Sequence, residues 1–127
     1  MVWTNEPPDE WEIDNSKLFG VDDEGIGVTE WKGWAFADKD WWVEAAEDQR
    51  RSEWLGGRGT VAIADPDEWD DRGSPGAQGR FETYLSTPPI PLSEVAPNTA
   101  VLSFDSSWRP EFDDNYHQSG KLTVSFD

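Results

Sequence analysis

A glycine-rich turn leads directly into a short apolar run at residues 56–64, Gly56-Gly57-Arg58-Gly59-Thr60-Val61-Ala62-Ile63-Ala64. Turn formers followed by β-branched residues are typical of a β-strand. A second apolar run comes earlier in the chain, Gly33-Trp34-Ala35-Phe36-Ala37, and has the same character. We therefore expect strands at residues 33–37 and 60–64, within a fold made largely of short strands.

Three further segments alternate apolar and polar residues with a period of two, which predicts strands at residues 80–86, 100–105 and 121–126. Helical character is confined to a short stretch within residues 40–54. A chain of 127 residues has room for one domain with one core. We expect an all-β, antiparallel, jelly-roll-like β-sandwich over residues 1–127, with an irregular segment and an early strand in 1–30 and the core in 31–127.

Tryptophan is unusually frequent in this chain. Nine indoles are difficult to bury in a core of this size, because each needs a large space and a partner for its N–H. We expect some of them to be exposed, where an indole can stack on the flat face of a sugar ring. The alternative is that most of them fill the core. The nine are Trp3, Trp11, Trp31, Trp34, Trp41, Trp42, Trp54, Trp69 and Trp108.

The chain is strongly acidic, with 27 Asp and Glu against 10 Lys and Arg and a formal net charge of −17. We therefore do not expect nucleic acid or an anionic membrane surface as a partner, since both require a basic face on the protein. Three explanations of the acidity stay open, and they are compatible with one another: calcium binding, life at high salt, and attraction of a cationic partner.

The densest acidic stretch is residues 65–71, Asp65-Pro66-Asp67-Glu68-Trp69-Asp70-Asp71. We expect an irregular loop here, in which like charges repel unless a cation or an arginine lies among them. Calcium prefers oxygen ligands, so the sequence predicts calcium as a stabilising ion. The spacing does not match the twelve-residue calcium loop of helix-loop-helix proteins. The candidate metal ligands are Asp65, Asp67, Asp70, Asp71, Asp38 and Asp40.

Two clusters combine tryptophan with arginine, a pairing that supplies both a stacking surface and hydrogen-bond donors for a sugar. One follows the strand at 100–105 and the other precedes the strand at 60–64. Simple ion pairing and edge packing are the alternative roles for these side chains. The candidate ligand-binding residues are Trp108, Arg109, Trp69, Trp54, Arg51 and Gln49.

Catalysis has little support in the sequence. Cysteine is absent, so neither disulfides nor thiolate metal sites can form, and His117 is the only histidine. No Gly-x-Ser-x-Gly elbow accompanies the serines. Paired carboxylates for glycoside hydrolysis stay open as an alternative, because carboxylates are abundant and their separations are set only by the fold. We expect a protein that is not an enzyme.

Several stretches together resemble a known group of modules: Gly33-Trp34-Ala35-Phe36-Ala37-Asp38-Lys39-Asp40-Trp41-Trp42, Asp48-Gln49-Arg50-Arg51-Ser52-Glu53, residues 59–71, and Leu85-Ser86-Thr87-Pro88 with Trp108-Arg109-Pro110-Glu111. The chain from about residue 30 onward is similar to jelly-roll modules of the cleaved-adhesin, MAM and carbohydrate-binding type in large secreted proteins of aquatic bacteria. The resemblance implies a non-catalytic binding or adhesion module, often stabilised by calcium, that is extracellular or on the cell surface. It assigns no binding residue.

Jelly rolls of this kind continue for several strands beyond the one that ends here at residue 126, so we expect a sandwich that is truncated or is completed by a neighbouring copy. No run is long enough for a membrane span or a signal peptide. The predicted function is recognition of a polysaccharide through exposed tryptophans and polar loops. The alternative is a self-assembling structural or adhesion protein of a filament or surface layer, with the tryptophans at contacts within a homo-oligomer.

Overall fold

The structure is a computed structural model that describes residues 2–72, 79–110 and 117–126. Short strands alternate with short helices, and all of the strand pairing is antiparallel. The elements in chain order are β1 (Trp3–Thr4), β2 (Glu12–Asp14), the 3₁₀ turn η1 (Thr29–Trp31), β3 (Trp34–Asp38), α1 (Lys39–Ala45), the 3₁₀ turn η2 (Arg51–Glu53), β4 (Thr60–Ala64), α2 (Pro66–Asp70) and β5 (Tyr84–Ser86).

The larger sheet has three strands in the order β1-β3-β4. Its central strand, β3, pairs with β4 in a register that places Phe36 opposite Ala62, and Ala35 opposite Ile63. Ala35, Phe36 and Ala37 are all buried, and because successive side chains point to opposite faces, both faces of β3 are covered here. In β4 only Val61 and Ile63 are buried, which is the alternation of a strand with one covered face. The strands predicted at 33–37 and 60–64 are confirmed.

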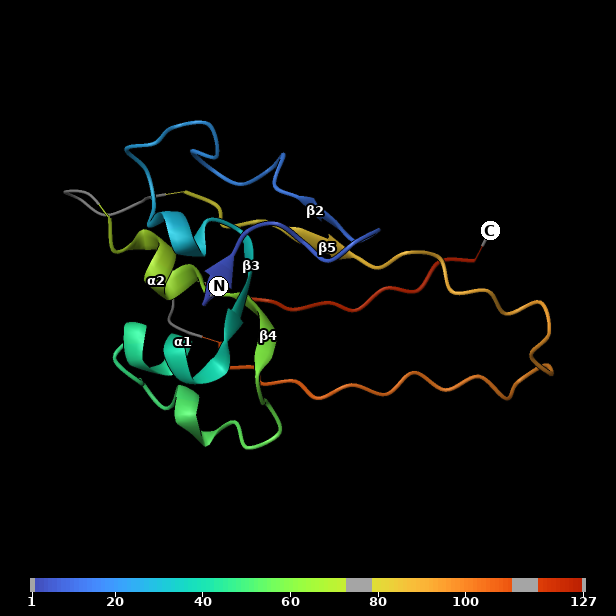
Figure 1. Cartoon of the computed structure of the whole chain (residues 1–127). Coiled ribbons are helices and arrows are strands. Elements are labelled where there is room, and N and C mark those ends of the chain that lie inside the picture. Colours follow the sequence, from blue (N-terminus) through green and yellow to red (C-terminus); the bar gives the residue numbers. More distant parts are fainter. Residues whose placement is uncertain (1, 73–78, 111–116, 127) are drawn as a thin grey trace.

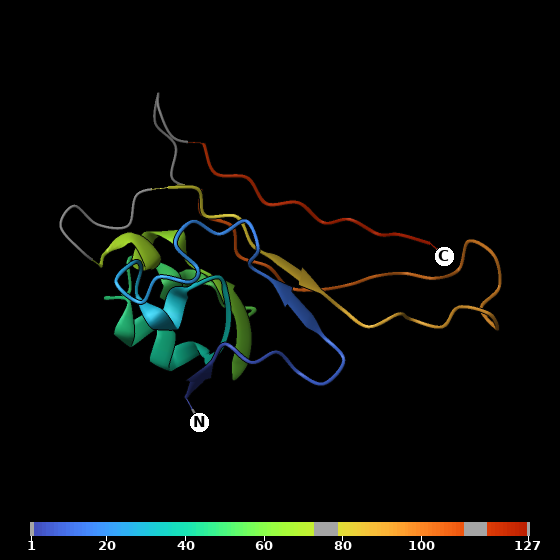
Figure 2. The same ribbon diagram turned by 90° about the horizontal axis from the view of Figure 1, so that it is seen from above.

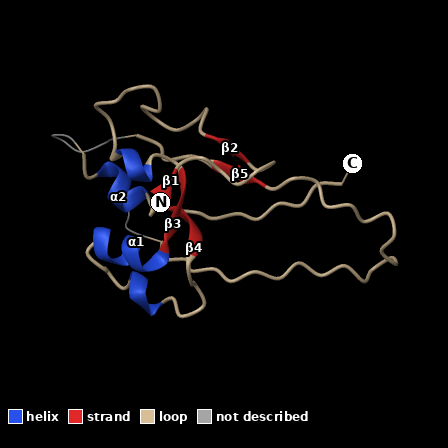
Figure 3. Cartoon of the chain, in the orientation of Figure 1, coloured by secondary structure: helices blue, strands red, loops and turns tan. Residues whose placement is uncertain are grey.

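One hydrophobic core joins this sheet to the helices beside it (Figure 3). Trp31 stacks on Trp41 with ring centroids 5.7 Å apart, and Trp69 meets Phe81 edge-on at 5.4 Å. The tryptophans are therefore used mainly inside or at the border of the core. The buried members of the cluster are Leu18, Trp31, Ala35, Ala37, Val61, Ile63 and Trp69.

Helix α1 begins at Asp38, whose carboxylate accepts hydrogen bonds from the backbone N–H groups of Asp40 and Trp41, as an N-cap does. It ends in a left-handed turn that starts at Glu47, with φ of 51°. The N–H of Asp48 donates to the carbonyl of Val43, and the N–H of Glu47 donates to that of Glu44. These two bonds make a Schellman ending, although the turn residue is not glycine. The helix occupies the first half of the stretch predicted at 40–54.

Helix α2 stands where the sequence predicted an irregular acidic loop, so that prediction was wrong. Asp65 accepts a hydrogen bond from the N–H of Glu68, and Pro66 occupies the first turn, where its missing N–H does no harm. The repulsion among the carboxylates is relieved by Arg51, which lies against three of them. With that charge in place, the capping signals determine the local structure.

The smaller sheet is the pair β2 and β5, with Ile13 opposite Leu85. It lies beside the larger sheet in Figure 1. Residues 87–110 then leave the body as a long excursion, and residues 117–126 extend on the same side (Figures 1 and 2). Of the strands predicted at 80–86, 100–105 and 121–126, the first is present in part, as β5. Residues 100–105 and 121–126 belong to no sheet among the described residues. The β-rich, antiparallel architecture is thus confirmed in its coarse form.

Candidate functional site

One face of the β2–β5 pair carries a row of polar side chains and an aromatic ring. Glu12 lies opposite Ser86, and Asp14 lies opposite Tyr84. Because side chains alternate between the faces of a strand, these four share one face, and Ile13 and Leu85 occupy the other. All four of the polar-face residues are exposed. We call this surface the Tyr84 face.

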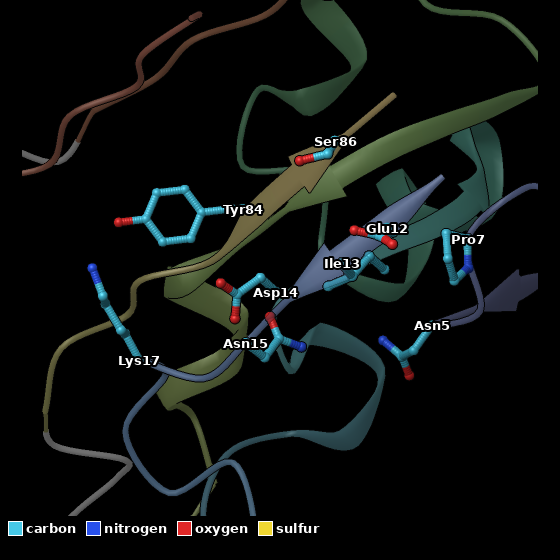
Figure 4. Close-up of a pocket in the computed structure, with 9 residues that line it drawn as sticks. All are labelled: Asn5, Pro7, Glu12, Ile13, Asp14, Asn15, Lys17, Tyr84 and Ser86. Carbon is cyan, nitrogen blue, oxygen red and sulfur yellow. The ribbon is translucent and has the colours of Figure 1, made fainter. Parts of the chain in front are cut away.

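An open pocket of about 760 Å³ adjoins the Tyr84 face (Figure 4). The two strands supply one wall, and the segment that follows β1 supplies Asn5 and Pro7. The rest of the lining comes from Asn15 and Lys17, which follow β2 directly. The pocket thus combines amides, carboxylates, a hydroxyl, an ammonium and a phenol ring, which are the groups that bind the hydroxyls and ring faces of sugars.

Electrostatic contacts arrange the side chains at the end of this pocket. The Lys17 ammonium lies 5.5 Å from the centre of the Tyr84 ring and 3.4 Å from a carboxylate oxygen of Glu82. The Tyr84 hydroxyl donates to Glu82. These contacts raise the pKa of Lys17, and hydrogen bonding, first from Tyr84 and then from Lys17, lowers the pKa of Glu82. Lys17 is therefore a cation and Glu82 an anion at neutral pH.

Asp14 is also held in its charged form. Its carboxylate accepts a hydrogen bond of 2.8 Å from the N–H of Ser16. Hydrogen bonding by Ser16 is the main reason that the pKa of Asp14 is lowered, with a smaller contribution from Lys17. The Tyr84 face therefore offers a fixed carboxylate acceptor beside an aromatic ring.

A second polar constellation lies inside the protein, around Arg51. Its Nη2 is 2.9 Å from Asp65 Oδ2 and 3.0 Å from Glu68 Oε1, and its Nη1 donates to the carbonyl of Ala46 at 2.9 Å. The Trp42 indole N–H donates to the same Asp65 oxygen, and the Arg51 guanidinium lies 5.7 Å from the Trp42 ring. Arg51 and Asp65 are both buried. This cluster stabilises the junction of α1, η2 and α2.

Two of the predicted ligand-binding residues are therefore corrected. The guanidinium of Arg51 donates its hydrogen bonds to Asp65, Glu68 and the carbonyl of Ala46, so it is not available to an external ligand. Trp69 is only 2% exposed and packs against Phe81 in the core. A sugar cannot reach the face of a buried indole. Both residues have a structural role in place of the predicted one.

The other four candidates are not buried. Trp54 is half-buried and covers Gly57, and Gln49 is exposed in the left-handed turn after α1. Trp108 is 56% exposed, and its ring lies over Gly120. Arg109 is close enough to Asp48 and Glu53 to contribute to the lowering of the pKa of both carboxyls, although hydrogen bonds from Ser52 and from Arg50 are the larger causes.

The predicted metal ligands do not gather around a common centre. Asp38 caps α1, and Asp65 is paired with Arg51. Asp67 lies 3.4 Å from the same guanidinium. Asp40 is exposed in the first turn of α1, and Asp71 is exposed at the C-cap of α2. Across residues 2–72, 79–110 and 117–126, no group of three acidic or histidine side chains is arranged to hold a metal ion.

The Tyr84 face was not predicted from the sequence. The alternation at residues 80–86 indicated that Tyr84 and Ser86 share a face, but the partner strand, Glu12-Ile13-Asp14, is only three residues long. The two strands are separated by about seventy positions, and nothing local specifies that they pair. A polar-apolar-polar triplet after Trp11 was the one available signal.

None of the helices in the described part of the chain has both the length and the apolar character that crossing a bilayer requires. Comparison of this chain with models of known protein families, with characterised proteins and with solved structures found no match.

Proposed function

We propose that this protein is a non-catalytic recognition module that binds a polysaccharide on the Tyr84 face. The observation that supports this most directly is the pocket beside β2 and β5, in which Tyr84, a residue that is 45% exposed, lies among side chains able to bond to hydroxyl groups. A pyranose ring presents flat C–H faces and equatorial hydroxyls. An exposed aromatic ring with polar groups around its edge matches both features.

Each side chain of the pocket has a separate part in this proposal. The Tyr84 ring stacks on one sugar face, and the carboxylates of Asp14 and Glu12 accept hydrogen bonds from sugar hydroxyls. Lys17, with a side chain that is 63% exposed, donates to hydroxyl oxygens at the edge of the ring. Ser86 both donates and accepts. Two strands hold these groups in register, so little ordering is needed when the ligand binds.

The charge of the chain selects among polysaccharides. A net charge of −17, with two carboxylates on the binding face itself, repels anionic polymers at low ionic strength. Neutral glycans are therefore the preferred class of ligand. Uronate polymers become candidates only where calcium bridges the two sets of carboxylates.

The ionisation of Asp14 favours binding over hydrolysis. A glycosidase needs one carboxylic acid that stays protonated near neutral pH, which requires a raised pKa. Asp14 has a lowered pKa instead, because Ser16 stabilises its charged form. The Asp14 carboxylate therefore suits hydrogen-bond acceptance.

Three further elements of the proposal rest on the resemblance to jelly-roll modules. The two sheets would be parts of a β-sandwich, the module would be extracellular or on the cell surface, and calcium would stabilise it. The antiparallel pairing supports the first in outline. Calcium stays a prediction that the melting experiment in the Discussion tests.

Affinity electrophoresis and titration calorimetry with neutral β-glucan, xylan and mannan test the proposal. We expect at least one of them to bind, and Tyr84→Ala to weaken that binding about tenfold, which corresponds to about 1.4 kcal/mol. Tyr84→Phe is the matched control, since it keeps the ring and removes only the hydroxyl. Trp108→Ala tests the binding site that the sequence predicted at Trp108, and so distinguishes that site from the Tyr84 face.

Three results would reject the proposal. If none of the neutral polymers binds at high protein concentration, polysaccharide recognition is wrong. If one binds but Tyr84→Ala leaves the affinity unchanged while Trp108→Ala abolishes it, the ligand lies at Trp108 and the Tyr84 face has no part. Release of reducing sugar by the wild-type protein would show a hydrolase.

A further inference from the structure

The two segments beyond β5, residues 87–110 and 117–126, form what we call the arm. We propose that the arm is a docking surface for a second copy of this chain, in which residues 119–126 of the two copies pair as antiparallel strands about a two-fold axis. This goes beyond the proposed glycan binding and does not depend on it.

The backbone of the arm is prepared for such pairing. Residues 100–110 and 119–126 are extended yet belong to no sheet within the described residues, and both lie on the same side of the body (Figures 1 and 2). Residues 100–110 return towards the body, where Asp105 lies close to Gly56, and residues 119–126 lead away from it. An extended strand without a neighbour presents a row of N–H and C=O groups that another strand can satisfy. Strand addition is a common mode of association because it needs no rearrangement of the rest of the fold.

The side chains of the arm have the pattern of strands that are covered on one face. Leu122, Val124 and Phe126 fall on one side of their segment and are 62%, 61% and 82% exposed. Lys121, Thr123 and Ser125 fall on the other side. In the other segment, Leu102 and Phe104 repeat this spacing and are exposed as well. So many apolar side chains in water mark a surface that associates.

Charge indicates that the occupant is another copy of this chain. Residues 1–72 contain twenty of the 27 acidic residues and seven of the 10 basic ones. By contrast, the arm contains two acidic residues, Glu94 and Asp105, and two basic ones, Arg109 and Lys121. A partner drawn to the body would be cationic, whereas the arm matches a neutral, apolar strand. The arm of a second copy is such a strand, and arm-to-arm contact leaves the two acidic bodies apart.

The sequence of the arm is self-complementary in one register. With Thr123 on the two-fold axis, Leu122 lies opposite the partner's Val124, and Lys121 lies opposite the partner's Ser125. Gly120 lies opposite the partner's Phe126, beside the Trp108 ring that already covers Gly120. Like charges are not opposed, and the apolar faces coincide. A two-fold contact is satisfied by one surface used twice, which is the usual form of a dimer.

Light scattering after size exclusion, over a series of protein concentrations, tests the proposal with two variants of equal charge. Leu122→Glu places a carboxylate on the apolar face, and we expect it to convert a dimer into a monomer. Ser125→Glu adds the same charge on the other face, opposite the partner's Lys121, and we expect it to keep or strengthen the dimer. Near-ultraviolet circular dichroism checks that the body is folded in both, since the arm contributes nothing to the buried cluster.

A cross-link tests the register. The chain has no cysteine, so Thr123→Cys introduces a single thiol, which we expect to form an intermolecular disulfide on mild oxidation. Ser52→Cys, on the exposed surface of η2, is the control that should stay reduced. A wild-type protein that is monomeric up to high micromolar concentration would overturn the proposal. Equal dissociation by Leu122→Glu and Ser125→Glu, or equal cross-linking at 52 and 123, would overturn it as well.

Discussion

Arg51 and Asp65 form an ion pair inside the protein, with 2.9 Å between Nη2 and Oδ2 and side chains that are each 7% exposed. Fourteen positions separate them, and β4 runs between them in the sequence. Asp65 also caps α2 and accepts the Trp42 indole N–H. One carboxylate thus connects the helix before β4 to the helix after it, and one guanidinium compensates its charge.

Replacing Arg51 should strongly destabilise the folded protein. Arg51→Met leaves Asp65 buried without its counter-charge, and we expect a loss of about 3–5 kcal/mol in the free energy of unfolding. Arg50→Met is the matched control, because Arg50 pairs with Glu53 on the surface and should cost about 1 kcal/mol or less. Urea unfolding followed by tryptophan fluorescence measures both. Similar midpoints for the two variants would contradict the structural role of Arg51.

The core position of Trp69 can be tested through a glycine. A Cβ at Gly27 would lie 2.1 Å from Trp69 Nε1, and the backbone there has a φ of +72°. A Cβ at Gly59 meets nothing within 4 Å, at a φ of +60°. Both Gly→Ala changes should lower the free energy of unfolding by about 1 kcal/mol, because alanine is strained in a left-handed backbone conformation. Gly27→Ala should lower it by about 1–3 kcal/mol more, because the added methyl group overpacks the core. Equal thermal midpoints would place Trp69 away from Gly27.

The left-handed turn after α1 offers a stabilising substitution. Glu47 has a φ of 51° at the position where helices usually place glycine. We expect Glu47→Gly to raise the free energy of unfolding by about 1 kcal/mol, because glycine adopts this conformation without a steric penalty. Glu44→Gly removes the same charge within the helix and should lower stability by about 1 kcal/mol. If both changes destabilise, residue 47 is not left-handed in solution.

Glu68 should give the protein a measurable pH dependence. Burial raises the pKa of Glu68 above its usual 4.5, and this effect outweighs the attraction of Arg51. A raised pKa in the folded state means that folding favours the protonated acid. The contribution of Glu68 to stability is therefore full below its unfolded-state pKa and is lost as the pH rises through its folded-state pKa. Compared with Glu68→Gln, the wild type should gain stability as the pH falls towards 4.5, which urea unfolding at a series of pH values measures. If the free energies of unfolding of the two proteins change in parallel with pH, the prediction is refuted.

Calcium can be tested by thermal melting in millimolar calcium and in chelator. If an ion stabilises the fold, the midpoint rises with calcium concentration by mass action. Magnesium at the same ionic strength is the control, since general screening of a chain with a net charge of −17 would raise the midpoint with either ion. A response that is equal for the two ions assigns the effect to screening.

Local pattern was sufficient for the parts of the fold that depend on neighbours in the chain. The strands β3 and β4 lie where glycine turns and apolar runs predicted them, within one residue at each end. The prediction of an irregular loop in place of α2 was wrong because the start signals Asp65 and Pro66 determine the local structure once the charge repulsion is relieved. Arg51, which relieves that repulsion, is remote in sequence.

The sequence by itself determined the acidic character of the chain, the strands β3 and β4, and the polar-apolar alternation of the arm. The tertiary structure decided which tryptophans and arginines are available to a ligand. Burial of Trp69 and Arg51, and the pairing of β2 with β5 that creates the Tyr84 face, depend on contacts between distant segments. Alternation and capping act over a few residues, whereas burial and strand pairing are set by the free energy of the whole fold.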